Sequence, residues 1–469
     1  MKLEGDVVIG LECHVTLKTA TKLFCGCRAT PETGENDLPN ARTCEVCLGH
    51  PGSKPVLNKK ALEYGIKLGL ALGCRIANAI NFSRKTYFYP DMAKNYQVTQ
   101  FEVPLGNGGE IVLDSGKKVR LKRVHIEEDP ASLVHQGKIT TSPYVLVDYN
   151  RSGVPLVEVV TEPDMNSPDE AREFMKKLIS VLSYIGVFDL EKGIIKADAN
   201  ISIKEKDYTR VEVKNITGFK EIERALNYEM KRQKREPVTM ETRAWDSEEG
   251  VTRSLRSKET EEDYGYIIDP DLVEYELSES LIRTIKTSIP ELAAQKIERF
   301  ISHYKITKDD AQVLASDYLL AELFERSAKR VKASTAVEWV RKELMGILNY
   351  NKIEFYESRM DSKEFFDLIE MVEKGQVTKE IARGILRKLP FQELKVKEYI
   401  QKEGLTAISG EDELKKLCHL AIVSNPKPVD DYKKGEEKSL NFLVGQVMRS
   451  SKGTAQPDAV KKILMELIK

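Results

Sequence analysis

The sequence predicts an α+β protein with a large mixed, β-rich core that carries a cysteine-bearing insertion, then an all-helical middle domain and a small helical tail domain. Residues 1 to about 290 hold short apolar runs, broken by Gly and Pro, with the alternation typical of strands. After that point apolar residues recur at three- and four-residue spacing, as on one helix face: Leu292, Ile297, Phe300, Ile301 and Tyr304. A break rich in Gly, Ser and Thr at 403–410 precedes the last helical segment.

These changes of period divide the chain into domains. A final amphipathic helix begins at about Pro457, because the residues after it place an apolar stripe on one face: Ile463, Leu464, Leu467 and Ile468. A chain of 469 residues has room for about two to four domains. We therefore expect three: a core at 1–292, a helical domain at 293–405 and a tail domain at 406–469.

Composition argues against several classes of protein. The chain is 41% hydrophobic and 31% charged with a formal net charge of −1, so no global positive field indicates nucleic-acid binding, although a local basic face can form. No apolar run reaches the about 18 residues of a membrane span, and residues 1–6 lack the apolar stretch of a secretory signal. Together with an odd number of cysteines, seven, this predicts a cytoplasmic protein.

Two close cysteine pairs predict a metal site in the insertion. Cys25 and Cys27 form a C-x-C pair, and Cys44 and Cys47 form a C-x-x-C pair after residues 28–43. Four thiolates in this layout are typical of a structural, tetrahedral Zn²⁺ site, whose closed shell leaves no position for water. Loose buried thiols or a disulfide pair are the alternatives.

Residues 9–17 alternate as a strand does. The odd positions are apolar, whereas Glu12 and His14 share the other face. A carboxylate and an imidazole two residues apart project side by side, as ligands of a divalent ion would. A solvated strand face with an incidental Glu and His is the plainer reading.

Two further acidic features bear on this possibility. Glu127, Glu128 and Asp129 are consecutive, which by itself is typical of a solvated turn. Glu158, however, interrupts the apolar run 154–160, where an unpaired carboxylate would be very unfavourable. It needs a partner, which could be a cation shared with Glu12 and the acids at 127–129, or a buried Arg or Lys. Mg²⁺ prefers oxygen ligands and bridges to nucleotide phosphates, so we expect a Mg²⁺–phosphate site.

Bases and aromatic residues mix at 82–97, which includes Arg84 and Lys85. Such a segment can hold a phosphate or stack a base, and it is also what a packed aromatic corner looks like. The chain has no G-x-x-x-x-G-K-[ST] loop, so any use of ATP is not of the P-loop kind. It also lacks a G-x-S-x-G elbow and a Gly/Ser-rich amidase signature, so it is poorly equipped to release ammonia from glutamine.

Taken in order, these segments resemble the GatB family, the B subunits of tRNA-dependent amidotransferases. The resemblance rests on about ten motifs in the family's order, at 8–15, 82–91, 125–129, 147–158, 197–202, 212–215, 241–243, 256–259, 269–272 and 441–448. The archaeal E subunit, the nearest relative, carries a domain-sized insertion for which about twenty residues after Leu272 leave no room.

The resemblance implies an ATP-dependent carbon–nitrogen ligase with glutamine as amido donor. The core would phosphorylate the side-chain carboxylate of misacylated Asp-tRNA(Asn) or Glu-tRNA(Gln), or both, and ammonia would then give the amide. It also implies three sets of site residues. Around Mg²⁺ it places Glu12, His14, Glu128 and Glu158, with Glu127 as a possible substitute for Glu128. Phosphate or carboxylate contacts fall to Arg84 and Lys85, and the weaker candidates for the same pocket are Asp198 and Asn200.

The resemblance also implies partners. Ammonia would arrive from an amidase A subunit, with a small C subunit tying the two together, and the lysine-bearing helices of 411–469 would carry part of the tRNA binding. The rival interpretations are a non-catalytic tRNA-binding module and a stand-alone ligase acting on a small molecule. The buried Glu158 argues against the first, and the long helical region argues against the second.

Overall fold

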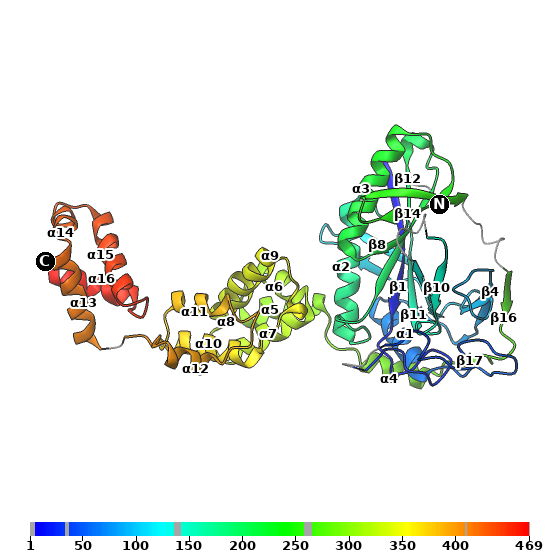
Figure 1. Ribbon diagram of the computed structural model, residues 1–469, viewed down its shortest axis with the longest axis horizontal. Helices are drawn as coiled ribbons and strands as arrows, with labels where there is room; N and C mark the ends of the chain where they lie inside the picture. The colour runs from blue at the N-terminus through cyan, green and yellow to red at the C-terminus, as the bar shows by residue number, and fades with distance from the viewer. Residues whose placement is uncertain (1–4, 33–36, 136–141, 258–264, 409, 469) are drawn as a thin grey trace. The chain divides into compact units, whose positions relative to one another are not determined.

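The computed structural model describes residues 5–32, 37–135, 142–257, 265–408 and 410–468. They separate into two compact units, Met1–Leu292 and Ala293–Lys469 (Figure 1). The described part of the first unit is a mixed, sheet-rich core, and that of the second is helical, so the predicted α+β class is confirmed. The further division of the second unit at residue 405 stays a prediction.

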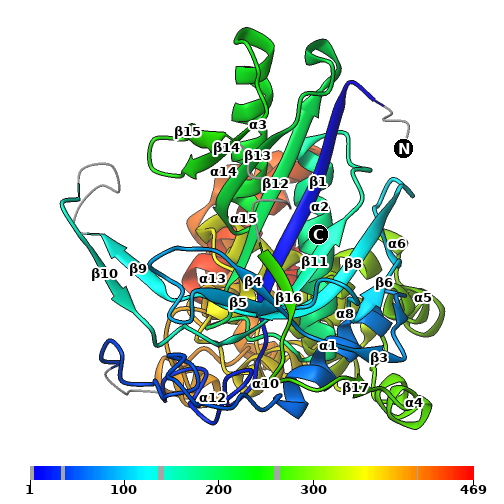
Figure 2. The ribbon, with the colours of Figure 1, turned by 90° about the vertical axis from the view of Figure 1, so that its right-hand side faces the viewer.

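A ten-stranded sheet organises the first unit. Figure 2 shows its long central strands side by side. Neighbouring strands are antiparallel except β13 and β14, which are parallel. The spatial order is β15 (Val251–Ser257), β14 (Glu241–Asp246), β13 (Val211–Thr217), β12 (Ile195–Ile203), β1 (Val7–Thr16), β11 (Pro155–Thr161), β8 (Lys118–Glu128), β6 (Gly106–Asn107) and β2 (Arg75–Ile76), with β7 (Glu110–Val112) also paired to β8.

Helices cover the apolar face of this sheet: α1 (Lys59–Ala71), α2 (Pro168–Ile185) and α3 (Phe219–Arg235). Local sequence fixes where they begin, since Asn58 caps α1, and Ser167 caps α2 just ahead of a proline. Gly65 lets α1 approach β8 closely, because a Cβ there would lie 2.8 Å from Ile126 Cδ1. The opposite face of the central strands is left to polar side chains.

A three-stranded sheet flanks the polar face, in the order β16 (Gly265–Ile268), β4 (Ser83–Thr86) and β5 (Tyr96–Thr99), and β5 contacts β8. The described part of the first unit also contains two strand pairs, β9 (Ser132–His135) with β10 (Val145–Asp148) and β3 (Ala79–Ile80) with β17 (Tyr275–Glu276), together with α4 (Glu279–Thr287) and a 3-10 turn at Lys204–Lys206. Residues 82–97 therefore form an edge of the polar side, as part of this small sheet.

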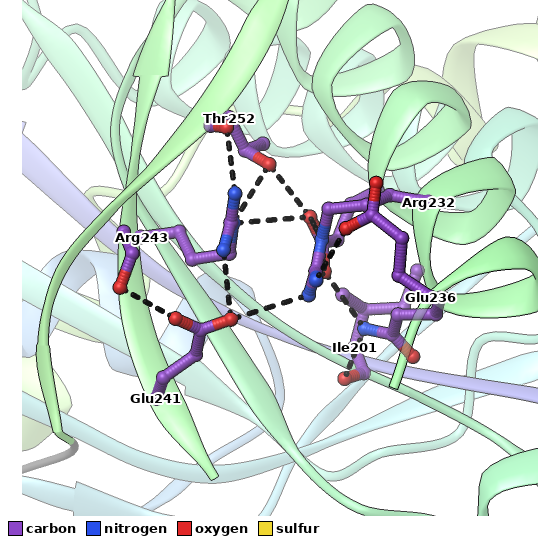
Figure 3. A network of polar contacts seen from close by, with 9 residues as sticks. Ile201, Arg232, Glu236, Glu241, Arg243 and Thr252 are labelled. Carbon is purple, nitrogen blue, oxygen red and sulfur yellow. Dashed lines mark hydrogen bonds and ion pairs between the residues drawn. The ribbon is translucent and has the colours of Figure 1, made fainter. Parts of the chain in front are cut away.

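A buried charged network joins α3 to the outer strands (Figure 3). Glu229 is fully buried and accepts hydrogen bonds from Arg232 Nη2 and Thr252 Oγ1, both at 2.7 Å. Arg243 Nε lies 3.6 Å from Glu229 Oε2, and Arg243 Nη1 donates to Glu241 Oε1 at 2.7 Å. Since each charge has an opposite partner, the network holds the helix in one position on β14 and β15.

Helices follow one another through the described part of the second unit. The first group is α5 (Ala293–Tyr304), α6 (Lys308–Ala315), α7 (Tyr318–Ala328), α8 (Ala333–Val337), a π-helical turn (Glu338–Leu344), α9 (Met345–Asn351), α10 (Ser362–Glu373), α11 (Lys379–Leu386) and α12 (Val396–Lys402). The second group encloses a small core of its own and comprises α13 (Glu411–Ser424), α14 (Pro426–Lys433), α15 (Glu437–Ser450) and α16 (Pro457–Ile468). No helix in the described ranges is long and apolar enough to cross a membrane.

Candidate functional site

The two faces of β1 differ in the way that its alternation predicts. Cys13 is buried on the helix-covered face, with its Sγ 3.3 Å from Met175 Sδ of α2. Glu12 and His14 point to the opposite face, because successive side chains alternate along a strand. The polar side chains of β1 therefore lie where those of the neighbouring strands can reach them.

Strand register aligns three polar residues across the sheet. His14 is opposite Glu158 on β1 and β11, and Glu158 is opposite His125 on β11 and β8. Glu158 Oε2 lies 2.9 Å from His125 Nε2 and 3.9 Å from His14 Nε2. The acid that interrupts an apolar strand thus lies between two imidazoles, which are charge partners for it.

Glu127 joins this row from β8. Its Oε1 lies 3.5 Å from His14 Nε2, and Thr99 Oγ1 donates to its Oε2 at 3.1 Å. The ligand atoms of His14, Glu127 and Glu158, hereafter the carboxylate–imidazole group, all lie within 4.8 Å of one another. In octahedral Mg²⁺ with bonds of about 2.1 Å, ligands are about 3.0 Å apart in cis and about 4.2 Å in trans. The spacing of the group is therefore compatible with a bound metal ion.

Electrostatics make the group strongly ionic. Burial lowers the pKa of His14 and of His125, but Glu158 and Glu127 outweigh it, so both imidazole pKa values are raised. Burial raises the pKa of Glu158 and of Glu127, yet the histidines outweigh it and both carboxyl pKa values are lowered. Without a metal ion, a proton on His14 offsets part of the carboxylate charge, and a bound cation can take its place.

Glu12 lies between the carboxylate–imidazole group and a second polar cluster. Asn200 Nδ2 donates to Glu12 Oε1 at 3.0 Å, and Lys214 Nζ lies 3.0 Å from Asp198 and 3.3 Å from Glu212. Burial, followed by the charges of Glu158, Glu212 and Asp198, raises the pKa of Glu12. The structure thus brings Asp198 and Asn200 close to Glu12, with Asp198 neutralised by a lysine.

Arg84 and Lys85 point to different sides of β4, as neighbours in a strand do. Arg84 Nε is 2.9 Å from Asp269 Oδ2, its Nη2 is 3.1 Å from Asp271 Oδ2, and its guanidinium stacks on Tyr96. Lys85 is close enough to Glu158 to help lower the pKa of that carboxyl group. Of this pair, Lys85 is the residue whose charge acts on the carboxyl group of Glu158.

Glu128 is turned away from the group that its neighbour Glu127 joins. Its Oε1 accepts from the backbone N–H of Val98 at 2.8 Å and forms an ion pair with Lys94. The structure therefore does not bring Glu128 together with His14 and Glu158. Glu127, expected only as a substitute, occupies that position because it shares the face of His125.

The four cysteines of the insertion converge. Their sulfur atoms all lie within 4.8 Å of one another, and Cys44 Sγ is 3.9 Å from Cys47 Sγ. A tetrahedral Zn²⁺ with Zn–S bonds of about 2.3 Å separates its sulfurs by about 3.8 Å. The N–H of Cys44 also donates to Cys47 Sγ at 3.1 Å. The cluster can hold a metal ion, and its spacing is compatible with zinc.

His125 had no role in the sequence interpretation, although it contacts Glu158 more closely than His14 does. Arg123 Nε donates to His125 Nδ1 at 3.2 Å, which leaves Nε2 to donate to the carboxylate. The alternation of side chains along β8 was a signal for this histidine, because His125 lies on the same strand face as Glu127, two residues further on.

Two family models match this chain. The model of the GatB/GatE catalytic domain matches residues 7–283, and the model of the GatB domain matches residues 322–468. The chain belongs to the GatB family. The resemblance inferred from the ordered motifs is thereby confirmed, and the carboxylate–imidazole group falls within the range matched by the GatB catalytic domain.

Several curated proteins are similar to this chain over almost their whole length. The B subunit of the aspartyl/glutamyl-tRNA(Asn/Gln) amidotransferase of Thermodesulfovibrio yellowstonii is 41% identical over 482 residues, with 100% of both chains covered. The corresponding B subunits of Carboxydothermus hydrogenoformans and Thermotoga maritima are each 42% identical, with 98–99% of this chain and 98% of each relative covered. This GatB chain is therefore similar to those proteins over its whole length.

Proposed function

We propose that this chain is the B subunit of a tRNA-dependent amidotransferase. Its substrate is Asp-tRNA(Asn), Glu-tRNA(Gln) or both. The γ-phosphoryl group of ATP passes to the side-chain carboxylate of the misacylated amino acid, and ADP leaves. Ammonia then attacks the carbonyl carbon, phosphate leaves and the nitrogen loses a proton, which gives the amide.

One observation carries the proposal: an ionic group of two carboxylates and an imidazole on the polar face of a GatB catalytic domain. Phosphoryl transfer depends on positioning and on charge neutralisation rather than on a protein nucleophile. A rigid sheet that holds carboxylates and imidazoles in register suits such a reaction. A module that only binds tRNA has no need of these buried ionisable residues.

In this proposal His14, Glu127 and Glu158 hold Mg²⁺. When bound, the cation neutralises the γ-phosphate and the charge that develops during transfer. His125 keeps one carboxylate oxygen of Glu158 in place, since its Nε2 lies 2.9 Å from Oε2. Glu12 lies at the border of the group, where burial and the neighbouring carboxylates raise its pKa.

The other predicted residues receive narrower roles. Lys85, near Glu158, is the proposed phosphate or carboxylate contact. Arg84 is engaged by Asp269 and Asp271, so we propose that it positions β4 and that it reaches phosphate only by leaving them. Asn200 orients Glu12 through its hydrogen bond, and Asp198, paired with Lys214, lies in the same neighbouring cluster. We propose no metal contact for Glu128, which is paired with Lys94.

The cysteine cluster and the partners complete the proposal. Cys25, Cys27, Cys44 and Cys47 hold one Zn²⁺ as a structural ion, because a closed shell of four thiolates leaves no open coordination site. An amidase A subunit supplies ammonia, a small C subunit joins the complex, and the tail at 406–469 contacts the tRNA. The reducing cytoplasm keeps the four cysteines as thiols.

Amide formation tests the proposal. The chain, co-purified with its amidase partner, receives ATP, Mg²⁺ and glutamine, and the amide is measured on Asp-tRNA(Asn) and on Glu-tRNA(Gln) in parallel. Product on at least one tRNA is expected. Glu158→Gln should lower kcat at least about 100-fold, because a neutral side-chain amide replaces a charged metal ligand. The matched control is Glu205→Gln, which changes an exposed glutamate far from the group in sequence and should leave the rate unchanged.

Two outcomes would contradict the proposal. Full activity in Glu158→Gln would mean that the carboxylate–imidazole group takes no part in the reaction. No amide on either tRNA, with both tRNAs still bound, would assign the chain to the non-catalytic tRNA-binding modules.

A further inference from the structure

A lysine lies fully buried beside the cysteine cluster. Lys22 follows β1, and its relative exposure is 0%. Its Nζ donates to Cys47 Sγ at 3.6 Å and to the carbonyl oxygen of Tyr149 at 3.3 Å. The acceptors of these two bonds are a sulfur and a carbonyl oxygen, so neither bond pairs the ammonium group with a carboxylate. Lysine is rarely buried to this extent without a negative partner.

Charge balance explains why a lysine belongs at this position. Four thiolates around one Zn²⁺ carry a net charge of −2, and the cluster is partly buried. An ammonium group next to one of the sulfurs offsets part of this charge and donates a hydrogen bond to it. If the sulfurs were neutral thiols, the same ammonium would be a buried charge without a full counter-charge, which is strongly unfavourable.

Backbone contacts tie this lysine to the chain that leads toward the carboxylate–imidazole group. The N–H of Lys22 donates to the carbonyl of Cys27 at 2.9 Å, and that of Leu23 donates to the carbonyl of Gly153 at 2.8 Å. Gly153 in turn donates to the carbonyl of Asp129 at 2.9 Å. Gly153 has φ +83°, and a Cβ on it would lie 3.5 Å from Cys47 Cβ and 3.6 Å from Lys22 Cδ. The lysine, the cluster and the start of β11 are thus one packed unit.

We propose that Lys22 is the charge-compensating residue of the cysteine cluster, which stabilises the Zn²⁺-bound state through its ammonium group. The proposal rests on the assignment of zinc to the four cysteines. It adds a residue outside the cysteine pattern whose contribution depends on the thiolates. It does not depend on the amide-forming reaction.

Zinc affinity of the full chain tests the proposal first. Zinc is titrated against a chromophoric chelator in the parent chain, in Lys22→Met and in Lys54→Met. Lys54 lies near the same cysteines but is 73% exposed and pairs with Asp271, so it serves as the matched control. Removing a group that supports a metal ligand typically weakens metal binding about 10- to 100-fold, and we expect this effect on zinc binding in Lys22→Met. Lys54→Met should leave zinc binding unchanged. Unchanged affinity in Lys22→Met would overturn the proposal.

A second measurement separates charge compensation from ordinary packing. Lys22→Met is placed in a chain in which Cys25, Cys27, Cys44 and Cys47 are all serine, and urea midpoints are compared. Lys22→Met should lower the midpoint of the zinc-loaded parent and raise that of the serine chain, where the ammonium has lost its thiolates. If Lys22→Met lowers the urea midpoint equally in the parent and in the serine chain, or prevents folding of both, the lysine acts independently of the cluster.

A parent chain that binds no zinc would overturn both the zinc assignment and the role of Lys22. Neither measurement reads amide formation, so failure of the proposed reaction would leave their results intact. The two proposals therefore fail in different experiments.

Discussion

Glu158 of β11 and His125 of β8 are directly opposite each other, with the carboxylate Oε2 2.9 Å from the imidazole Nε2. The contact occupies one oxygen of Glu158 and fixes the direction of the other. A metal ligand held in this way loses less freedom on binding its cation, which is why residues behind the ligands of metal sites tune affinity.

Replacing His125 should therefore weaken cation binding without removing a ligand. We expect His125→Asn to raise the Kd for Mg²⁺, or for Mn²⁺ as its probe, about 10- to 100-fold by calorimetric titration. His419→Asn, a change at an exposed histidine of α13, is the matched control and should leave the Kd unchanged. Equal affinities in all three chains would mean that His125 does not support Glu158.

Stability of the metal-free chain should depend on pH through the same residues. Burial lowers the pKa of His14, but the charges of Glu158 and Glu127 raise it by more, so the pKa of His14 is raised in the folded chain. A histidine whose pKa is higher in the folded chain than in the unfolded chain stabilises the fold when it is protonated. This stabilisation is complete below the unfolded-chain pKa of about 6.5, and it is lost as the pH rises through the pKa of the folded chain. Glu158 and Glu127 have lowered pKa values, so their ionised carboxylates stabilise the fold. This stabilisation is present above about pH 4.5 and is lost as the pH falls further.

The contribution of this group should accordingly be largest between pH about 4.5 and about 6.5 and should decline toward alkaline pH. Thermal unfolding of the chelator-treated chain at several pH values between about 6 and 9 measures the decline. His14→Asn should flatten it, whereas His303→Asn, a change at an exposed histidine of α5, should not. A parallel decline in both variants would assign the effect to other residues.

Removing zinc should destabilise the first unit before the second. The four cysteines span residues 25–47, and their cross-linking by a metal ion contributes folding free energy to the segment that contains them. We expect a chelator to lower the Tm of the unit at 1–292 and to leave the transition of the unit at 293–469 in place, as followed by calorimetry. Cys44→Ser should reproduce this result, and Cys418→Ser, at a buried thiol outside the cluster, should keep its zinc.

The charged network of Figure 3 should be costly to break on one side. In Glu229→Gln, Arg232 and Arg243 lose the carboxylate between them while they remain buried or nearly so. Breaking a buried pair in this way costs about 3–5 kcal/mol of unfolding free energy, which urea titration can measure. Glu110→Gln removes the partner of Lys118 at an exposed pair and should cost less than about 1 kcal/mol.

The tail should contribute to tRNA binding through charge. Exposed lysines cluster on α13 and α16, which pack together: Lys415, Lys416, Lys461 and Lys462. Changing these four to Gln should weaken binding and lower the slope of log K against log[salt] by about 0.7–0.9 for each phosphate that the tail no longer neutralises. Lys59→Gln, at an exposed residue of α1, serves as the control. An unchanged slope in the fourfold variant would remove α13 and α16 from the tRNA-binding surface.

Much of the candidate site follows from local pattern. The alternation of residues 9–17 gives the strand, its buried face and the shared face of Glu12 and His14. The hydrophobic run around Glu158 shows that this acid is buried and needs a partner. Cysteine spacing alone predicts the convergence of four sulfurs.

What the sequence interpretation missed depends on which strands pair. His125 becomes the partner of Glu158 only when β8 lies beside β11, and nothing local to either strand specifies that register. The same pairing decides between Glu127 and Glu128, since one of two consecutive residues must face away. Likewise, Asp269 engages Arg84 through an ion pair between residues far apart in the sequence.

Because the group is built from residues aligned across β1, β11 and β8, its composition depends on the count of residues within each strand. Deleting one residue ahead of Glu158 in β11 would bring the carboxylate to the helix-covered face and a valine to the polar one. Loops between strands can change length without this effect. Indels should therefore accumulate between the strands of related chains, and the interiors of these three should keep a constant length over long divergence.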